Sequence, residues 1–118
     1  MKPPIFTVDN NEDLGVLFEN WWESHVCPIA ATRGWDAVRY AKWSAKDIRG
    51  VDFRMVAPDG TEYLIDLGMT ARHKYDRSYK DTTALVTYNM VKALADDCSN
   101  MQKFLDNATL YWNGICAL

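Results

Sequence analysis

The segment from 51 to 67 predicts a β-hairpin of fixed register, and this hairpin constrains the fold more than any other feature of the chain. Apolar and polar residues alternate on both sides of Pro58-Asp59-Gly60, which is the period of a half-buried strand. Proline presets the first position of a tight turn and glycine takes the left-handed one, so we expect a three-residue loop. Phe53 then faces Ile65. The residues expected on the apolar face are Val51, Phe53, Met55, Ala57, Thr61, Tyr63, Ile65 and Leu67.

The same register places Asp52 directly opposite Asp66 on the other face of the hairpin. Like charges that face each other across two strands are destabilising, and a chain usually supplies a cation at such a place. The cation is either an arginine or lysine side chain or a bound metal ion. The simplest alternative is a solvent-facing pair neutralised by Arg54 or Arg49. A two-residue loop would put the aspartates on opposite faces, so the inference depends on the turn.

Helices and one further strand are expected around the hairpin. N-cap residues before an apolar stripe at helical spacing predict a first helix from about Asn11 to Val26, ended by Pro28. Before the hairpin we further expect a turn at 33–35, a strand or helical turn at 37–41 and a polar loop at 44–50. After it we expect a second helix over 84–95 capped by Thr82 or Thr83, a helical piece at 101–105 and a last strand at 108–112.

Length and composition indicate a single domain spanning 1–118, because 118 residues with 48% hydrophobic side chains can bury a core. The chain has no apolar run long enough to cross a membrane, and residues 1–6 lack the apolar core of a signal peptide, so we expect a cytoplasmic protein. Cys27, Cys98 and Cys116 show no CxxC spacing. They fit reduced thiols better than a structural zinc site.

Positive charge is concentrated in the middle of the chain. Residues 33–80 hold ten Lys/Arg and seven Asp/Glu, whereas the flanks hold three and nine. A basic surface of this kind can bind nucleic acid although the net charge is −3, and ordinary solvated charge is the alternative. We expect residues 72–80 to form a loop that contacts phosphate. The expected nucleic-acid contacts are Arg39, Lys42, Arg49, Arg72, His73, Lys74, Arg77 and Lys80.

Five tryptophans are many for this length. Trp21 and Trp22 cannot share one helix face, so one of them is expected to be exposed. Trp35 and Trp43 lie among basic residues, where aromatic rings can stack on unpaired bases or contact a protein partner. Core packing is expected for at least two of the five. His25 is expected to be a packed side chain of the first helix and not a metal ligand.

The acidic residues also follow a known pattern. Two segments joined by the turn resemble the PD-(D/E)XK nuclease superfamily, also called the restriction-endonuclease-like fold. They are Asp47-Ile48-Arg49-Gly50-Val51-Asp52-Phe53 and Ile65-Asp66-Leu67-Gly68. In that family an acid begins one strand. A second acid on the adjacent strand is followed two residues later by lysine, and a preceding helix often carries a glutamate. The matching positions are Asp52, Asp66 and Glu19, with Glu23 or Glu12 as alternatives to Glu19.

The resemblance implies a small α/β (α+β) domain with a central mixed sheet built on the 51–67 hairpin and flanked by helices. It also implies an endodeoxyribonuclease that uses Mg²⁺ or Mn²⁺ at Asp52 and Asp66, since paired carboxylates suit a hard cation. Gly68 occupies the lysine position and cannot stabilise charge on the attacked phosphate. Either another cation replaces the lysine, or the protein binds without cutting, or Gly68 is an inactivating substitution. The candidate cations are Lys74, Arg72 and Arg54.

Two functions are therefore expected. The first is hydrolysis of DNA, with Asp52, Asp66, Glu19 and Lys74 as the catalytic set. The second is a non-catalytic protein of the same fold that binds DNA or inhibits a nucleic-acid enzyme, as an accessory protein of a phage or mobile element. A homodimer is compatible with both.

Overall fold

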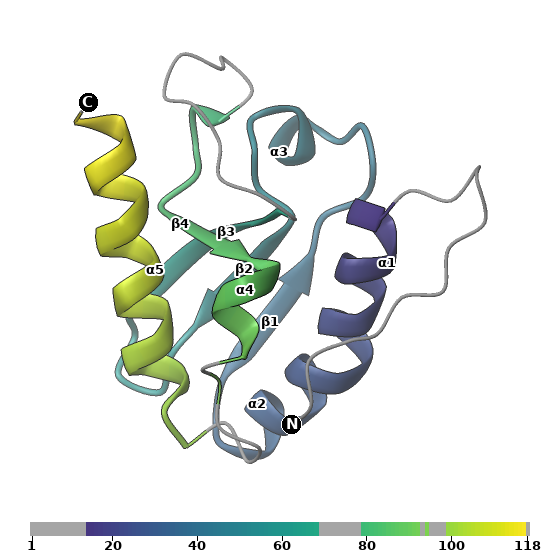
Figure 1. Cartoon of the computed structure of the whole chain (residues 1–118). Helices are drawn as coiled ribbons and strands as arrows, with labels where there is room; N and C mark the ends of the chain where they lie inside the picture. Colours follow the sequence, from purple (N-terminus) through teal and green to yellow (C-terminus); the bar gives the residue numbers. More distant parts are fainter. Residues whose placement is uncertain (1–13, 69–78, 93, 95–98, 118) are drawn as a thin grey trace.

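The predicted hairpin forms the centre of a four-stranded mixed sheet. The computed structural model describes residues 14–68, 79–92, 94 and 99–117. The strands are β1 (Asp36–Arg39), β2 (Phe53–Val56), β3 (Glu62–Gly68) and β4 (Ala84–Thr87), in the order β1-β2-β3-β4 (Figure 1). Pairing is antiparallel from β1 to β3 and parallel between β3 and β4. The chain is a mixed α/β domain with helices flanking this sheet, as the sequence predicts at that level.

From Phe53 to Ala57 the register of the hairpin is also the predicted one, whereas the predicted pairing of Asp52 with Asp66 is not part of the regular ladder. Phe53 pairs with Ile65 across the strands. Gly60 takes a left-handed φ of 89° in the turn, and its N–H donates to the Ala57 carbonyl at 2.9 Å. The expected apolar face is buried except at Thr61, which is exposed. Its buried members are Val51, Phe53, Met55, Ala57, Tyr63, Ile65 and Leu67.

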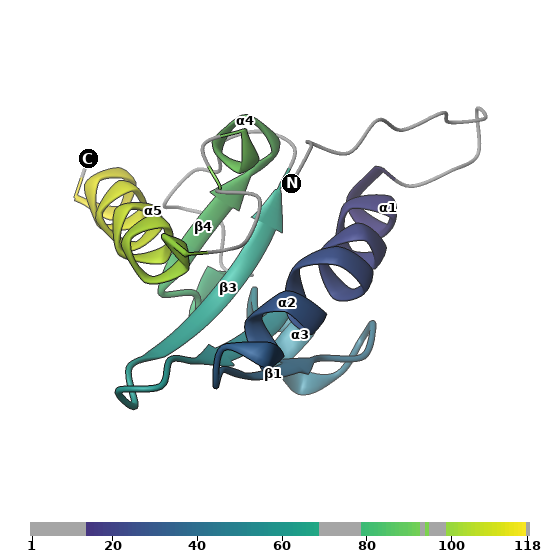
Figure 2. The ribbon, with the colours of Figure 1, turned by 90° about the horizontal axis from the view of Figure 1, so that it is seen from below.

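Helices cover the apolar face of the sheet (Figure 2). One continuous helical run lies over β1 to β3 and consists of α1 (Leu14–Trp21), a π-helix (Trp22–Val26) and α2 (Cys27–Thr32). Beyond β4 the chain forms the short α4 (Tyr88–Val91), and α5 (Met101–Cys116) packs against β4. Their inward side chains form one core with those of the sheet.

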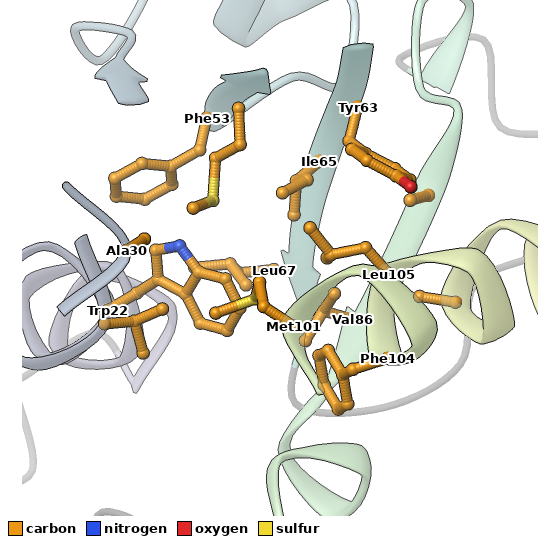
Figure 3. Packing of buried hydrophobic residues seen from close by; sticks show 14 of the residues in the cluster. Trp22, Ala30, Phe53, Tyr63, Ile65, Leu67, Val86, Met101, Phe104 and Leu105 are labelled. Carbon is orange, nitrogen blue, oxygen red and sulfur yellow. The ribbon is translucent and has the colours of Figure 1, made fainter. Parts of the chain in front are cut away.

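The core contains four of the five tryptophans: Trp21, Trp22, Trp35 and Trp112 are buried, whereas Trp43 is 79% exposed. Figure 3 shows Trp22 among buried side chains of the sheet and α5. The prediction that Trp21 and Trp22 cannot both be buried is wrong. The helix changes to a π-helix at Trp22, and its wider turn alters the angle between successive side chains. Burial of Trp35 also excludes this side chain from stacking on a base.

The first helical run is longer than predicted. It continues through Pro28 to Thr32 because the π-helix precedes the proline, with the Cys27 N–H donating to the Trp22 carbonyl. Pro28 therefore lies in the first turn of α2, where a missing N–H costs little.

His25, predicted to be packed, is exposed, and its ring stacks on Trp21 with the two ring centroids 5.7 Å apart.

The second half of the chain differs most from the prediction. The expected helix over 84–95 begins instead with β4, which is buried along its whole length and pairs in parallel with β3. Such a strand is a continuous apolar run, and periodicity alone does not separate it from a buried helix. The expected strand over 108–112 is part of α5, whose buried residues recur at helical spacing.

In the first half of the chain, the segment predicted as a strand or helical turn at 37–41 lies partly in β1. The predicted polar loop at 44–50 contains the short helix α3 (Ala45–Ile48).

Candidate functional site

Acidic side chains from three elements meet where β2 begins and β3 ends. Glu19 comes from α1, Asp47 from α3, and Asp52 directly precedes β2. Each offers one carboxylate oxygen, and these three oxygens lie within 4.8 Å of one another. Glu19 and Asp52 are buried and Asp47 is half-buried. We call these three residues the carboxylate cluster; Asp66 of β3, 5% exposed, interacts with its Asp52 member.

The backbone at Asp52 leaves the regular strand geometry. Its N–H donates to the Ile65 carbonyl of β3 at 2.8 Å, while its own carbonyl accepts from the Tyr40 N–H, after β1, at 2.9 Å. In a regular strand both groups of one residue point to the same neighbour. The Asp52 carboxylate in turn accepts the Leu67 N–H at 2.8 Å. This irregularity holds the carboxylate against the end of β3, as bulges do elsewhere when they redirect a side chain.

Burial and mutual repulsion disfavour the charged forms of these acids. Burial, followed by the negative charge of Asp66, raises the pKa of Asp52 from 3.8 to about 7, although the Leu67 N–H acts in the opposite direction. Burial and then the charge of Asp52 raise the pKa of Glu19 from 4.5 to about 7, against the opposing effect of Arg39 and Lys42. The cluster therefore gains stability either by holding protons or by binding a cation.

Asp47 is the member that the sequence prediction missed. Ser44 caps α3 by accepting the Asp47 N–H at 3.3 Å, and the Asp47 carboxylate accepts the Trp43 N–H at 2.7 Å. A serine followed three residues later by an acid, directly before a helix, is close to the capping-box pattern. That spacing could have identified α3 as a helix, but it does not say where Asp47 lies relative to Asp52.

The alternative in which Arg54 or Arg49 neutralises a solvent-facing aspartate pair is wrong. Both aspartates are buried. Arg54 pairs instead with Glu62 at 2.7 Å, and Arg49 pairs with Asp81 at 2.8 Å. The Arg49 guanidinium holds the pKa of Asp81 near 2.

Two of the predicted nucleic-acid contacts lie beside the carboxylate cluster. Arg39 and Lys42 line a hollow of about 590 Å³ together with Glu19 and Glu23. Arg39 donates to Glu23 at 3.0 Å. Arg49 and Lys80 are exposed, and Arg49 is engaged by Asp81. Four further predicted residues lie outside the described part of the chain: Arg72, His73, Lys74 and Arg77.

No protein-family model, curated protein or solved structure matches the chain. Within the described residues, none of the helices has both the length and the apolar character that a membrane span requires. A function must therefore be argued from the site itself.

Proposed function

We propose that the protein is a metal-dependent phosphodiesterase that hydrolyses DNA at the carboxylate cluster. The observation that carries this proposal is the convergence of Glu19, Asp47 and Asp52, whose oxygens lie within 4.8 Å of one another although two of the side chains are buried. The acid pattern shared with PD-(D/E)XK nucleases supports the same reaction class.

The donor set fits Mg²⁺ or Mn²⁺, because hard cations prefer carboxylate oxygens and the cluster supplies only these. Glu19, Asp47 and Asp52 would hold the ion, with the charge of Asp66 adding to its attraction. A bound ion would activate a water molecule and stabilise negative charge on the phosphate.

The cations at the hollow would position the substrate. Arg39 and Lys42 line the same hollow as Glu19. Their charges suit contacts to backbone phosphates, which orient a nucleic acid without reading its sequence. Since Gly68 offers no amine, these two side chains are our candidates for stabilising the phosphate.

The test combines metal binding with cleavage. The parent, Asp52→Asn and Asp66→Asn are incubated with plasmid, linear duplex, single-stranded and branched DNA in Mg²⁺ or Mn²⁺, and calorimetry measures metal affinity. Asp36→Asn is the matched control, because Asp36 is an exposed carboxylate on β1. We expect cleavage by the parent and the control, and loss of both metal binding and cleavage in Asp52→Asn. Absence of cleavage on every substrate, or full activity of Asp52→Asn, would contradict the proposal.

Gly68 favours one second candidate, a non-catalytic protein that binds DNA or blocks a nucleic-acid enzyme. Gly68 ends β3, two residues after Asp66, where the nuclease pattern has its lysine. In Gly68→Lys, a gain of metal-dependent cleavage would identify a nuclease site that lacks only this amine. An inert Gly68→Lys protein that also binds no metal would favour pure binding.

A further inference from the structure

Trp43 has an exposed side chain on a strained backbone. Its side chain is 79% exposed, the highest value among the large exposed apolar residues of the described chain. Its φ of 67° is left-handed, a conformation that is rare for bulky residues because Cβ approaches the following carbonyl oxygen. Strain of this kind persists only where neighbouring contacts impose it, and it is concentrated at functional sites.

The contact that imposes it comes from the carboxylate cluster. The Trp43 N–H donates to an Asp47 carboxylate oxygen at 2.7 Å. The next residue, Ser44, donates its N–H to the Ala41 carbonyl at 3.0 Å and caps α3. The main chain of Trp43 is therefore fixed within one hydrogen bond of a proposed metal-binding side chain, and its indole is exposed.

The charges near Trp43 distinguish between the possible occupants. Lys42 precedes it, and Lys42 and Arg39 line the hollow that also contains Glu19. A flat aromatic face next to cations matches a nucleotide, which presents a base to stack and a phosphate to pair. A protein-docking patch would instead place apolar residues around the ring, since the centre of such interfaces is depleted of charge.

We propose that Trp43 is a stacking platform for one unpaired base of a DNA strand, so that the adjoining phosphates lie at the carboxylate cluster. The substrate class is then DNA with unpaired bases, such as a single strand, a flap or a gap, because a base inside a duplex cannot offer its face to the indole. This inference rests on the proposed function and specifies its substrate.

The test separates base stacking from phosphate attraction. Fluorescence anisotropy measures binding of dye-labelled strands of about 12 nucleotides, a length within single-strand site sizes. One strand carries thymine bases and the other is abasic with the same phosphates. Ca²⁺ replaces Mg²⁺ to slow cleavage. The variants are Trp43→Leu, which keeps the same backbone strain but has no aromatic face, and Trp43→Tyr, which keeps a face. Ile48→Ala is the control, since Ile48 is an exposed apolar residue of α3.

We expect the parent to prefer the base-bearing strand by about 5- to 150-fold, the range for one stacked base. Trp43→Leu should lose this preference, Trp43→Tyr should keep most of it, and Ile48→Ala should leave it unchanged. A Trp43→Leu protein that keeps the preference overturns this inference. Equal weakening by Ile48→Ala also overturns it, because the preference would then come from general apolar contact and not from stacking on Trp43. If the parent protein cuts DNA although Trp43 proves not to stack on a base, the proposed function stands and only this inference fails. If the parent protein neither binds nor cuts DNA, the proposed function and this inference both fail.

Discussion

At the scale of single residues, Asp52 connects the parts of the site. Its carboxylate accepts the Leu67 N–H, and it interacts with both Glu19 and Asp66. Burial raises the pKa of Asp52 to about 7, so the folded protein binds a proton that the unfolded chain releases near pH 4. The stability linked to this proton is complete below the unfolded pKa and is lost as the pH rises through the folded one.

We therefore predict that the metal-free protein loses stability between pH 5 and pH 8, by roughly 2 kcal/mol. Asp52→Asn should reduce this dependence, leaving the part that comes from Glu19, and should be more stable than the parent at pH 8, because the amide is never charged. Urea unfolding in a chelator at both pH values measures the effect. Two results would show that Asp52 is ordinarily ionised. One is a free energy of unfolding of the parent that rises over this pH range. The other is a pH dependence of stability in Asp52→Asn that runs parallel to that of the parent.

At the scale of elements, α3 is short and depends on its cap. The Ser44 side chain accepts the Asp47 N–H of its first turn, in addition to backbone bonds such as that from the Ile48 N–H to the Ser44 carbonyl at 3.0 Å. The same helix carries Asp47 into the carboxylate cluster. Loss of the cap should therefore affect the site as well as the helix.

We predict that Ser44→Ala destabilises the protein by about 1 kcal/mol, the usual cost of a lost N-cap. It should also weaken Mg²⁺ or Mn²⁺ binding severalfold, because Asp47 is then less well positioned. Thermal unfolding and calorimetry measure the two effects. Ser24→Ala is the control, since the Ser24 hydroxyl bonds the Asn20 carbonyl of the long helical run and caps nothing. Unchanged metal affinity in Ser44→Ala would separate Asp47 from the metal site.

At the scale of the whole molecule, the fold brings acids that are far apart in the sequence into one buried place. Glu19 and Asp52 are held together by the packing of the first helical run on the sheet. The apolar core contributes the stability that offsets the cost of burying these carboxyl groups. A ligand that binds only the folded state then adds to that stability by mass action.

We predict that Mg²⁺ or Mn²⁺ at a hundredfold excess over its Kd raises the melting temperature by roughly 10 °C, from about 2.7 kcal/mol of binding free energy. Glu19→Gln and Asp52→Asn should lose this shift, while Asp36→Asn should keep it. Differential scanning calorimetry at pH 8 provides the measurement. If the parent shows no shift with either ion at millimolar concentration, the carboxylate cluster is not a metal site.

The hairpin was predictable because its determinants are local. Pro58, Asp59 and Gly60 set the turn, and strict alternation then fixes which side chain faces which. The register does not by itself account for the interaction of Asp52 with Asp66, because the regular pairing ends at Phe53 and the backbone at Asp52 is irregular. The turn and the alternation need no knowledge of elements outside the hairpin, whereas the irregularity at Asp52 involves the Tyr40 N–H that follows β1.

Other features were decided only by tertiary packing. The strand β4 has an apolar run that suits a helix equally well, and it is a strand because β3 offers an edge for parallel pairing. Likewise, the distance from Glu19 and Asp47 to Asp52 depends on how α1 and α3 pack at the end of the sheet. Sequence by itself determined the local geometry of the hairpin, whereas the third carboxylate, and the exposure of Trp43 beside it, arise from long-range contacts that no local pattern encodes.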